Sequence, residues 1–430
     1  MNEVKTTAAD QDELLRQAAI NRYLRGEKPA RICKVLGRSR RWFYTTLQHY
    51  RQAGRAGLRT QSRAPHHVHN RTPNEMEAAI VRVRQTIATG QDPELRYASL
   101  GADTIAFELK QAQLSPPHRA TINRVLKRHG LVQARPRRSE CFKLPDDYPW
   151  PQVTAPNAVH LFDFVSRTLS GGERCYGYHL LDQARRWPFL RVETTKTVET
   201  VSLFLVGSWR QVGLPTALYL DNDIVWNGGG RGQRVFSTIV RLCLLVGVEV
   251  IFTPPYTPQA NPVIESFNDV WSDNFWQRTQ FHNVAHAQDE LPLFEHYCRH
   301  RRPLADHAGQ TADHIVPDFV PMCLPASFQL DLSQPVPLTA GYVHFIRFVS
   351  GEGAFSILNE RWLLDKTRWA GRTIRATIDL AAQQLKVYHQ PVKYQKCQMI
   401  TQFDYPLEEE LQPLASTYHR PRAVLWPEKH

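Results

Sequence analysis

The chain has 430 residues, of which 42% are hydrophobic, so we expect two to four packed domains rather than a disordered chain. No run of about 18 apolar residues occurs, and the N-terminus lacks the pattern of a secretory signal, so neither a membrane partner nor export is expected. Seven cysteines are scattered singly without a CxxC pair, which indicates reduced thiols in a cytoplasmic protein.

The charge is unevenly distributed along the chain. Residues 1–140 carry 26 Lys and Arg against 12 Asp and Glu, a net charge of +14, whereas the other 290 residues carry 27 against 29. The basic surplus therefore lies in the first third of the chain. This indicates a polyanion partner for that third, and a merely soluble basic surface is the alternative.

Residues 1–55 have the layout of a helix-turn-helix domain. Apolar side chains recur at helical spacing over 11–25, a short helix follows over 32–36, and Gly37 closes it. Ser39 is a plausible N-cap for a third, basic helix. In this motif the N-terminal residues of the recognition helix reach the base edges of DNA. The residues expected to contact DNA are Arg38, Arg40, Arg41, Tyr44 and Thr45, whereas Phe43, Leu47 and Tyr50 are expected to face inward. A helical bundle with an incidental basic face is the alternative.

A second helical unit is predicted over 76–140, after a linker over 56–75. Within the linker, His66, His67 and His69 are interpreted as part of a solvated basic segment, with a metal site as the alternative. In the last helix of the unit, Ile122 and Leu126 share one face, and a polar face carries Arg119, Asn123 and Lys127. We expect these three polar residues to contact DNA beside the first unit.

The remainder of the chain changes to strands and mixed elements. A proline-rich linker over 141–156 leads into residues 157–300, where three meandering strands precede alternating helices and strands. This order predicts a mixed five-stranded sheet with helices on its faces. A connector over 301–334 follows. Alternating apolar positions over 335–405 predict a small β-barrel, and the tail, 406–430, is expected to be loose.

Three acids stand out within 157–300. Asp163 lies in the apolar run HLFDFVS, Asp221 follows the apolar run in LYLDNDIV, and Glu265 follows the proline-rich loop of YTPQANPVIESFNDVW. Two strand-borne aspartates and one helix-borne glutamate can gather beside one sheet and hold divalent cations. Two such cations, about 4 Å apart, stabilise the attacking and leaving oxygens of a phosphodiester. Carboxylates are common, so the surrounding sequence has to decide the assignment.

That surrounding sequence resembles a known family. The segments HLFDFVSR, YGYHLLDQARRW, LYLDND and PPYTPQANPVIESFN are similar to the integrase catalytic core of retroviral integrases and bacterial insertion-sequence transposases. The resemblance implies a ribonuclease-H-like α/β core in a multidomain chain, with helix-turn-helix units before it and an SH3-like β-barrel after it. It also implies that Asp163, Asp221 and Glu265 are the catalytic residues and the ligands of two Mg²⁺ ions, for which Mn²⁺ substitutes.

The chain departs from the family pattern at two places. Asp223 stands where the family has glycine after Asp221 and Asn222, and 43 residues separate Asp221 from Glu265 because of the glycine-rich insertion VWNGGGRGQR. In addition, Asn261-Pro262 stands where the family has Asn-Gly before the acidic helix, and proline is tolerated in the first turn of a helix. Neither departure removes a ligand.

Several neighbouring residues leave alternatives open. Asp182 is expected to cap a turn rather than bind metal, Asp223 is an alternative to Asp221, and Asp269 is expected on the surface. The auxiliary residues are Asn222, Gln259 and Asn261, and for the last two DNA positioning and loop capping are both open. Trp226 and Arg231, in the insertion, are weaker candidates for DNA contact.

These observations lead to the hypothesis of a DNA transposase. Such an enzyme binds the double-stranded ends of a mobile element, cuts them to free 3′-hydroxyls and joins those to target DNA. It would act as at least a homodimer on DNA in the bacterial cytoplasm, associated with the nucleoid. The alternatives are a catalytically inactive transposase-derived DNA-binding or regulatory protein, and a ribonuclease-H-like nuclease without joining activity.

Overall fold

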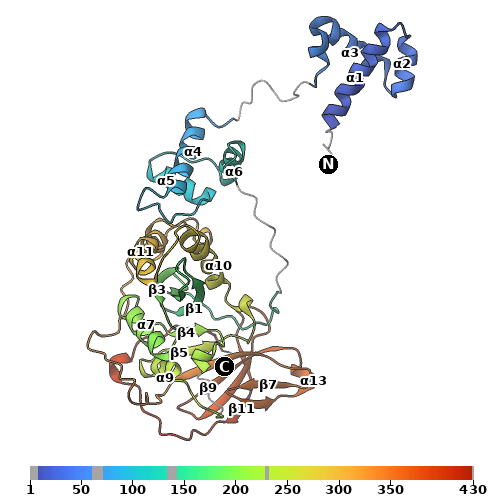
Figure 1. Ribbon diagram of the computed structural model, residues 1–430. Helices are drawn as coiled ribbons and strands as arrows, with labels where there is room; N and C mark the ends of the chain where they lie inside the picture. Colours follow the sequence, from blue (N-terminus) through green and yellow to red (C-terminus); the bar gives the residue numbers. More distant parts are fainter. Residues whose placement is uncertain (1–7, 61–70, 133–142, 228–231, 429–430) are drawn as a thin grey trace. The chain divides into compact units, whose positions relative to one another are not determined.

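The computed structural model describes residues 8–60, 71–132, 143–227 and 232–428. These residues form two compact units, one ending at Arg71 and the other comprising Thr72–His430 (Figure 1). The histidine cluster at 66–69 and Arg231 lie outside the described residues. Among the residues described, no helix is long and apolar enough to cross a membrane.

The first unit is a three-helix domain. Its helices are α1 (Ala8–Leu24), α2 (Pro29–Leu36), α3 (Arg40–Ala53) and the 3₁₀ turn η1 (Gly54–Leu58). Gly37 ends α2 in the left-handed region at φ 61°, and the Ser39 side chain accepts a hydrogen bond from the backbone N–H of Trp42, so the predicted turn and cap are both confirmed. Leu58 is buried against the helices, and the unit therefore extends past the predicted boundary at residue 55.

The predicted second helical unit is not independent. Its helices are α4 (Asn74–Thr89), α5 (Ala102–Gln111) and α6 (Arg119–Arg128). Tyr97, after α4, is buried with its ring 5.1 Å from that of Phe275, and its hydroxyl donates to Glu290 at 2.8 Å. Residues 72–132 therefore share one hydrophobic core with the domain that follows. The sequence did not reveal this docking because the contacting residues lie almost 200 positions apart.

One mixed sheet of nine strands forms the centre of the second unit, in the order β11-β10-β9-β6-β5-β4-β1-β2-β3. Its strands are β1 (Val159–Thr168), β2 (Arg174–Asp182), β3 (Trp187–Glu193), β4 (Ala217–Leu220), β5 (Glu249–Phe252), β6 (Tyr342–Phe348), β9 (Thr373–Asp379), β10 (Gln384–His389) and β11 (Gln398–Asp404). A hairpin of β7 (Ala354–Ile357) and β8 (Glu360–Leu363) lies outside the sheet.

This sheet corrects the predicted division between core and barrel. The five strands expected in 157–300 are present as β1–β5, but β6 pairs in parallel with β5 and continues the sheet into the C-terminal region. A separate SH3-like barrel is therefore not confirmed. The reason is physical: the apolar edge strand β5 would otherwise expose unpaired backbone groups, and β6 satisfies them.

Helices cover both faces of the sheet near β1. One face packs against α7 (Val198–Gln211) and α9 (Thr238–Leu245), and the opposite face against α10 (Pro262–Trp271) and α11 (Val284–His296). Gly177 in β2 makes the second packing possible, because a Cβ there would lie 2.6 Å from the Trp271 ring. The shorter helices and turns described are α8 (Ile224–Asn227), η2 (Pro258–Ala260), η3 (Ser272–Trp276), η4 (Tyr297–Arg301), η5 (Ala305–His307), α12 (Ala312–Ile315), α13 (Lys366–Trp369) and η6 (Ser416–Tyr418).

The described parts of the predicted linker and of the loose tail are packed. Tyr148 is fully buried, and its hydroxyl lies 2.9 Å from that of Tyr219 in β4. In the tail, the Trp426 indole donates to the carbonyl of Pro149 at 3.0 Å. Arg420 donates to four backbone carbonyls, those of Pro215, Val246, Gly247 and Tyr418. The prediction of a loose end was wrong, because proline-rich composition does not reveal such contacts.

Arg420→Met should destabilise the second unit. The substitution leaves several carbonyls without a donor, which costs about 2 kcal/mol. We expect the thermal unfolding midpoint of the full chain to fall by roughly 5 °C, measured by calorimetry. An unchanged midpoint would show that the tail contributes no stability.

Candidate functional site

The pairing of β1 with β4 brings two of the predicted acids together. The strands are parallel, with Leu161 opposite Tyr219. Continuing that register by two residues places Asp163, within β1, opposite Asp221, which directly follows the end of β4. Neighbouring strands lie about 4.8 Å apart, so the two aspartates come from adjacent backbone positions. Strand pairing thus brings two residues that are 58 positions apart in the sequence close together in space.

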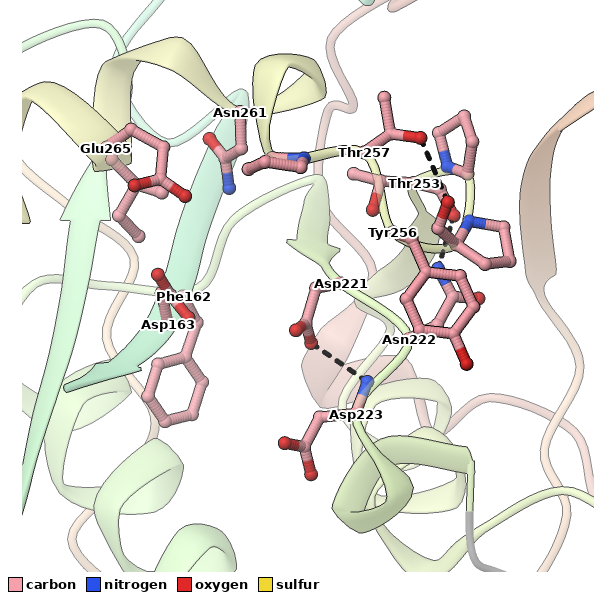
Figure 2. Close-up of a pocket in the computed structure, with 14 residues that line it drawn as sticks. Phe162, Asp163, Asp221, Asn222, Asp223, Thr253, Tyr256, Thr257, Asn261 and Glu265 are labelled. Carbon is pink, nitrogen blue, oxygen red and sulfur yellow. Dashed lines mark hydrogen bonds between the residues drawn. The ribbon is translucent and has the colours of Figure 1, made fainter. Parts of the chain in front are cut away.

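Glu265 reaches the same place from a helix that covers the sheet. The helix α10 begins with Pro262 in its first turn, as predicted, and Glu265 lies in that first turn. The helix packs on β1 through buried Ile264 and Phe267. Figure 2 shows the carboxylates of Asp163, Asp221 and Glu265 directed toward one common space.

That space is a pocket of about 360 Å³ with an acidic lining. The described residues that line it include four acids and no Lys, Arg or His; they are Phe162, Asp163, Asp221, Asn222, Asp223, Thr253, Pro254, Pro255, Tyr256, Thr257, Pro258, Asn261, Ile264 and Glu265 (Figure 2). The lining therefore carries an excess of negative charge that a bound cation would neutralise.

Asp163 is the most strongly perturbed of these acids. Its Oδ1 accepts a hydrogen bond from the backbone N–H of Phe164 at 2.7 Å, and its Oδ2 accepts one from the Asn268 amide at 3.0 Å. Burial, together with the smaller effect of the charges of Asp221 and Glu265, raises the pKa of Asp163 to about 7, although the two donors lower it. Without a cation, its negative form is therefore disfavoured.

Asp221 is oriented by donors from its own turn. Its Oδ1 accepts from the Trp226 indole at 2.7 Å and from the backbone N–H of Asp223 at 3.0 Å. Partial desolvation raises the pKa of Asp221, although these two donors lower it. Trp226 is fully buried and stacks on Phe164 at 4.8 Å. Trp226 therefore does not contact DNA as the weaker hypothesis had it; it supports Asp221.

The competing acids have other partners. Asp182 is buried and accepts from the backbone N–H of Ala184 at 3.1 Å, which confirms a turn-capping role. Asp223 forms an ion pair with Lys196 at 2.6 Å, and its Oδ1 accepts from the backbone N–H of Val225. Asp269 is exposed on α10 and does not line the pocket. Asp221 therefore remains the better candidate than Asp223.

Of the three predicted auxiliary residues, two line the pocket. Asn222 and Asn261 line the pocket, whereas Gln259 is absent from the lining. Asn261 occupies the N-cap position of α10, but its side chain makes no capping hydrogen bond. Loop capping by Asn261 is therefore not borne out, and its side chain is available to a ligand in the pocket.

The donor set suits a hard divalent cation. Carboxylate oxygens are the ligands that Mg²⁺ and Mn²⁺ favour. As the side chains stand, no group of three or more His, Cys, Asp or Glu within the described ranges is close enough to hold a metal ion. The excess of acids in the pocket and the raised pKa values of Asp163, Asp221 and Glu265 nevertheless fit a cation that would draw them together.

The residues predicted to contact DNA are accessible on their helices. All five in the first unit are exposed, and these are Arg38, Arg40, Arg41, Tyr44 and Thr45. Arg38 also donates to Asp12 at 3.0 Å. On α6, the three predicted residues Arg119, Asn123 and Lys127 are all exposed, whereas Ile122 and Leu126 are buried as predicted. Arg119 lies 3.3 Å from Asp103, an exposed pair that costs little to break.

Four residues around the pocket were missed by the sequence analysis. Asn268 donates to Asp163, Lys196 pairs with Asp223, and Tyr256 lines the pocket with its side chain fully exposed. Arg347 in β6 donates to Asn222 at 3.0 Å. Only Asn268 had a signal in the sequence, because its position three residues after Glu265 places it on the same helix face.

The helix-turn-helix is also recognised by comparison with known families. Residues 16–78 match the family model described as a winged helix-turn helix. This range includes α2 and α3, with the predicted recognition helix. The N-terminal region of the chain is thus similar to a winged helix-turn-helix.

Solved structures similar to this chain include three from integrases. The simian T-cell lymphotropic virus intasome, solved by cryo-EM in complex with the PP2A regulatory subunit B56 gamma, has a chain with 13% identity and a TM-score of 0.35, covering 72% of this chain and 96% of that chain. The HTLV-2 integrase catalytic core domain, in complex with magnesium, has 10% identity and a TM-score of 0.29, and the match covers 37% of this chain and 96% of that chain. The BIV integrase catalytic core domain has 16% identity and a TM-score of 0.28, and the match covers 37% of this chain and 93% of that chain. All three likenesses are weak.

Proposed function

We propose that this protein is a DNA transposase of the integrase type, which cuts the ends of a mobile element and joins them to target DNA. The observation that carries the proposal is the convergence of Asp163, Asp221 and Glu265 on one acidic pocket. The winged helix-turn-helix match supplies an independent reason to expect DNA as the partner.

The three carboxylates would hold two Mg²⁺ ions, or Mn²⁺ in their place. When bound, such ions lower the pKa of a coordinated water and stabilise the charge that develops on a phosphodiester. Asp163 would contribute carboxylate oxygens from β1, and Asp221 from the turn after β4. Glu265 would contribute its carboxylate oxygens from the first turn of α10. In the first step, water would attack the phosphodiester and break its P–O3′ bond, which leaves a free 3′-hydroxyl and a 5′-phosphate. In the second, that 3′-hydroxyl would attack a target phosphorus in line, and the 3′-oxygen of the target strand would leave.

Other side chains of the pocket keep the acids in place. Asn268 orients Asp163 through its amide, and Trp226 orients Asp221 through its indole N–H. Holding ligands in a fixed geometry lowers the entropy lost when the reacting groups align. Tyr256, exposed at φ 54° beside the pocket, is placed to stack on an unpaired base.

DNA recognition is assigned to the basic N-terminal third. The α3 residues Arg40, Arg41 and Tyr44 would contact one segment of an element end, and the exposed face of α6 a second. Two ends have to be brought together before joining, so the active form is at least a dimer on DNA. We place the protein in the bacterial cytoplasm, at the nucleoid.

Substitution of the acids should separate chemistry from binding. Asp163→Asn, Asp221→Asn and Glu265→Gln each remove a ligand charge, so we expect loss of Mn²⁺-dependent nicking and joining by at least a thousandfold, on the order of 4 kcal/mol. Binding to an element end, measured by fluorescence anisotropy, should change less than about threefold. Asp289→Asn, an exposed acid on α11, is the matched control and should retain activity. Full joining by the Asp221 variant would refute the assignment and favour a non-catalytic DNA-binding protein.

The raised pKa of Asp163, about 7, predicts a pH-dependent effect on stability. Because the ordinary value is 3.8, the folded protein binds this proton more tightly than the unfolded chain, so stability contributed by the group falls as pH rises from about 4 to about 7. Asp163→Asn should therefore raise the thermal midpoint by a few degrees at about pH 8 and by clearly less near pH 5, because most of the loss occurs between pH 5 and pH 7. Equal effects at both pH values, measured without divalent cations, would contradict this.

Arg41→Ala should weaken binding to the element ends. Loss of one contact to DNA is expected to reduce affinity about tenfold. It should also make the slope of log K against log salt concentration shallower by about one. Arg51→Ala is the control, because Arg51 lies in the last turn of the same helix, roughly 15 Å along its axis. A similar loss in both variants would indicate a diffuse basic surface instead of a recognition helix.

A further inference from the structure

A buried arginine from the C-terminal region reaches the turn that carries Asp221. Arg347 lies in β6 and is only 9% exposed. Its Nη1 donates to the carbonyls of Thr253 at 2.9 Å and Ile346 at 2.8 Å, and its Nε to the carbonyl of Ser356 at 3.0 Å. Its Nη2 donates to Asn222 Oδ1 at 3.0 Å.

Two of the four acceptors belong to the wall of the acidic pocket. Asn222 and Thr253 both line it, and the Asn222 amide also donates to the carbonyl of Thr253. Arg347 therefore fixes two loops to each other: the turn that follows β4 and the segment that follows β5. The planar guanidinium suits this task because its five donors have a fixed geometry.

The turn needs such support because its strand is short. Strand β4 has four residues, and Asp221 comes directly after its end. Each residue of the turn is held by a different element: Asp221 by Trp226, Asn222 by Arg347 and Asp223 by Lys196. Of these three supports, only Arg347 comes from outside the predicted core of 157–300.

We propose that Arg347 is a positioning residue for the acidic pocket, which holds Asn222 and thereby sets the orientation of Asp221 toward a divalent cation. The proposal rests on the proposed function of that pocket. It means that residues 157–300 do not contain a complete site, because the C-terminal strand supplies the residue that orders the turn.

Arg420 provides a matched comparison. It too is an arginine that donates to several backbone carbonyls, and burial lowers the pKa of both guanidiniums to about 10, so both stay charged at neutral pH. The acceptors of Arg420 are the carbonyls of Pro215, Val246, Gly247 and Tyr418, none of which lines the acidic pocket. A substitution at either site should destabilise the fold, but only one should disturb the pocket.

The experiment measures Mn²⁺ binding to the full chain by calorimetry, well below the unfolding temperature. Arg347→Met should weaken Mn²⁺ binding about tenfold, the equivalent of one hydrogen bond to an ordered turn, and Arg420→Met should change it less than twofold. Nicking assays should show the same difference as a higher Mn²⁺ concentration for half-maximal rate. Arg347→Lys, which keeps the buried charge but loses the guanidinium fork, serves if the Met variant does not fold, and should also weaken binding.

A double-mutant cycle tests whether Arg347 acts through Asn222. In an Asn222→Ala background, Arg347→Met should weaken Mn²⁺ binding no further, because the contact is already absent. Additive effects, or equal losses in the Arg347 and Arg420 variants, would overturn the positioning role alone. If the unsubstituted chain and its Asp163→Asn variant bind Mn²⁺ equally, the proposed function fails, and this inference fails with it.

Discussion

The pairing of β1 with β4 is the constraint on which the candidate site depends. Parallel strands in this register put Asp163 opposite Asp221, which directly follows the end of β4. Like charges at such positions repel each other, and burial increases the cost, as the pKa of Asp163, about 7, indicates. A sheet selected only for stability would place apolar residues there. The retained charge therefore points to a ligand that compensates it.

Side chains on both faces of the sheet hold the acids of the pocket in place. On the α7 side of the sheet, Phe162, Phe164 and Trp226 pack together, and the Trp226 indole is the only polar group of this cluster that reaches an acid. On the α10 side, Asn268 links the helix to Asp163. The acids are thus held from both faces by rigid elements, so their orientation does not depend on loops alone.

The segments of the second unit that the sequence predicts as separate domains form one folded body. Helices α4 to α6 share a hydrophobic core with α10 and α11, and strands β6, β9, β10 and β11 extend the core sheet. Within this unit, a basic helix face and an acidic pocket therefore belong to one folded body. The three-helix domain before it is a separate compact unit. In the proposed function, the first unit would hold DNA and the second would act on it.

The sequence by itself determined the local features: the helix-turn-helix with Gly37 and Ser39, the order of β1 to β5, the first turn of α10 at Pro262, and the three acids. Each depends on residues close together, where periodicity and caps act directly. Tertiary structure alone decided the continuation of the sheet through β6, the docking of residues 72–132, the packed tail, and the contacts of Trp226 and Arg347. These features depend on contacts between residues up to hundreds of positions apart. Such contacts, including buried hydrogen bonds, produce no periodic pattern in the sequence.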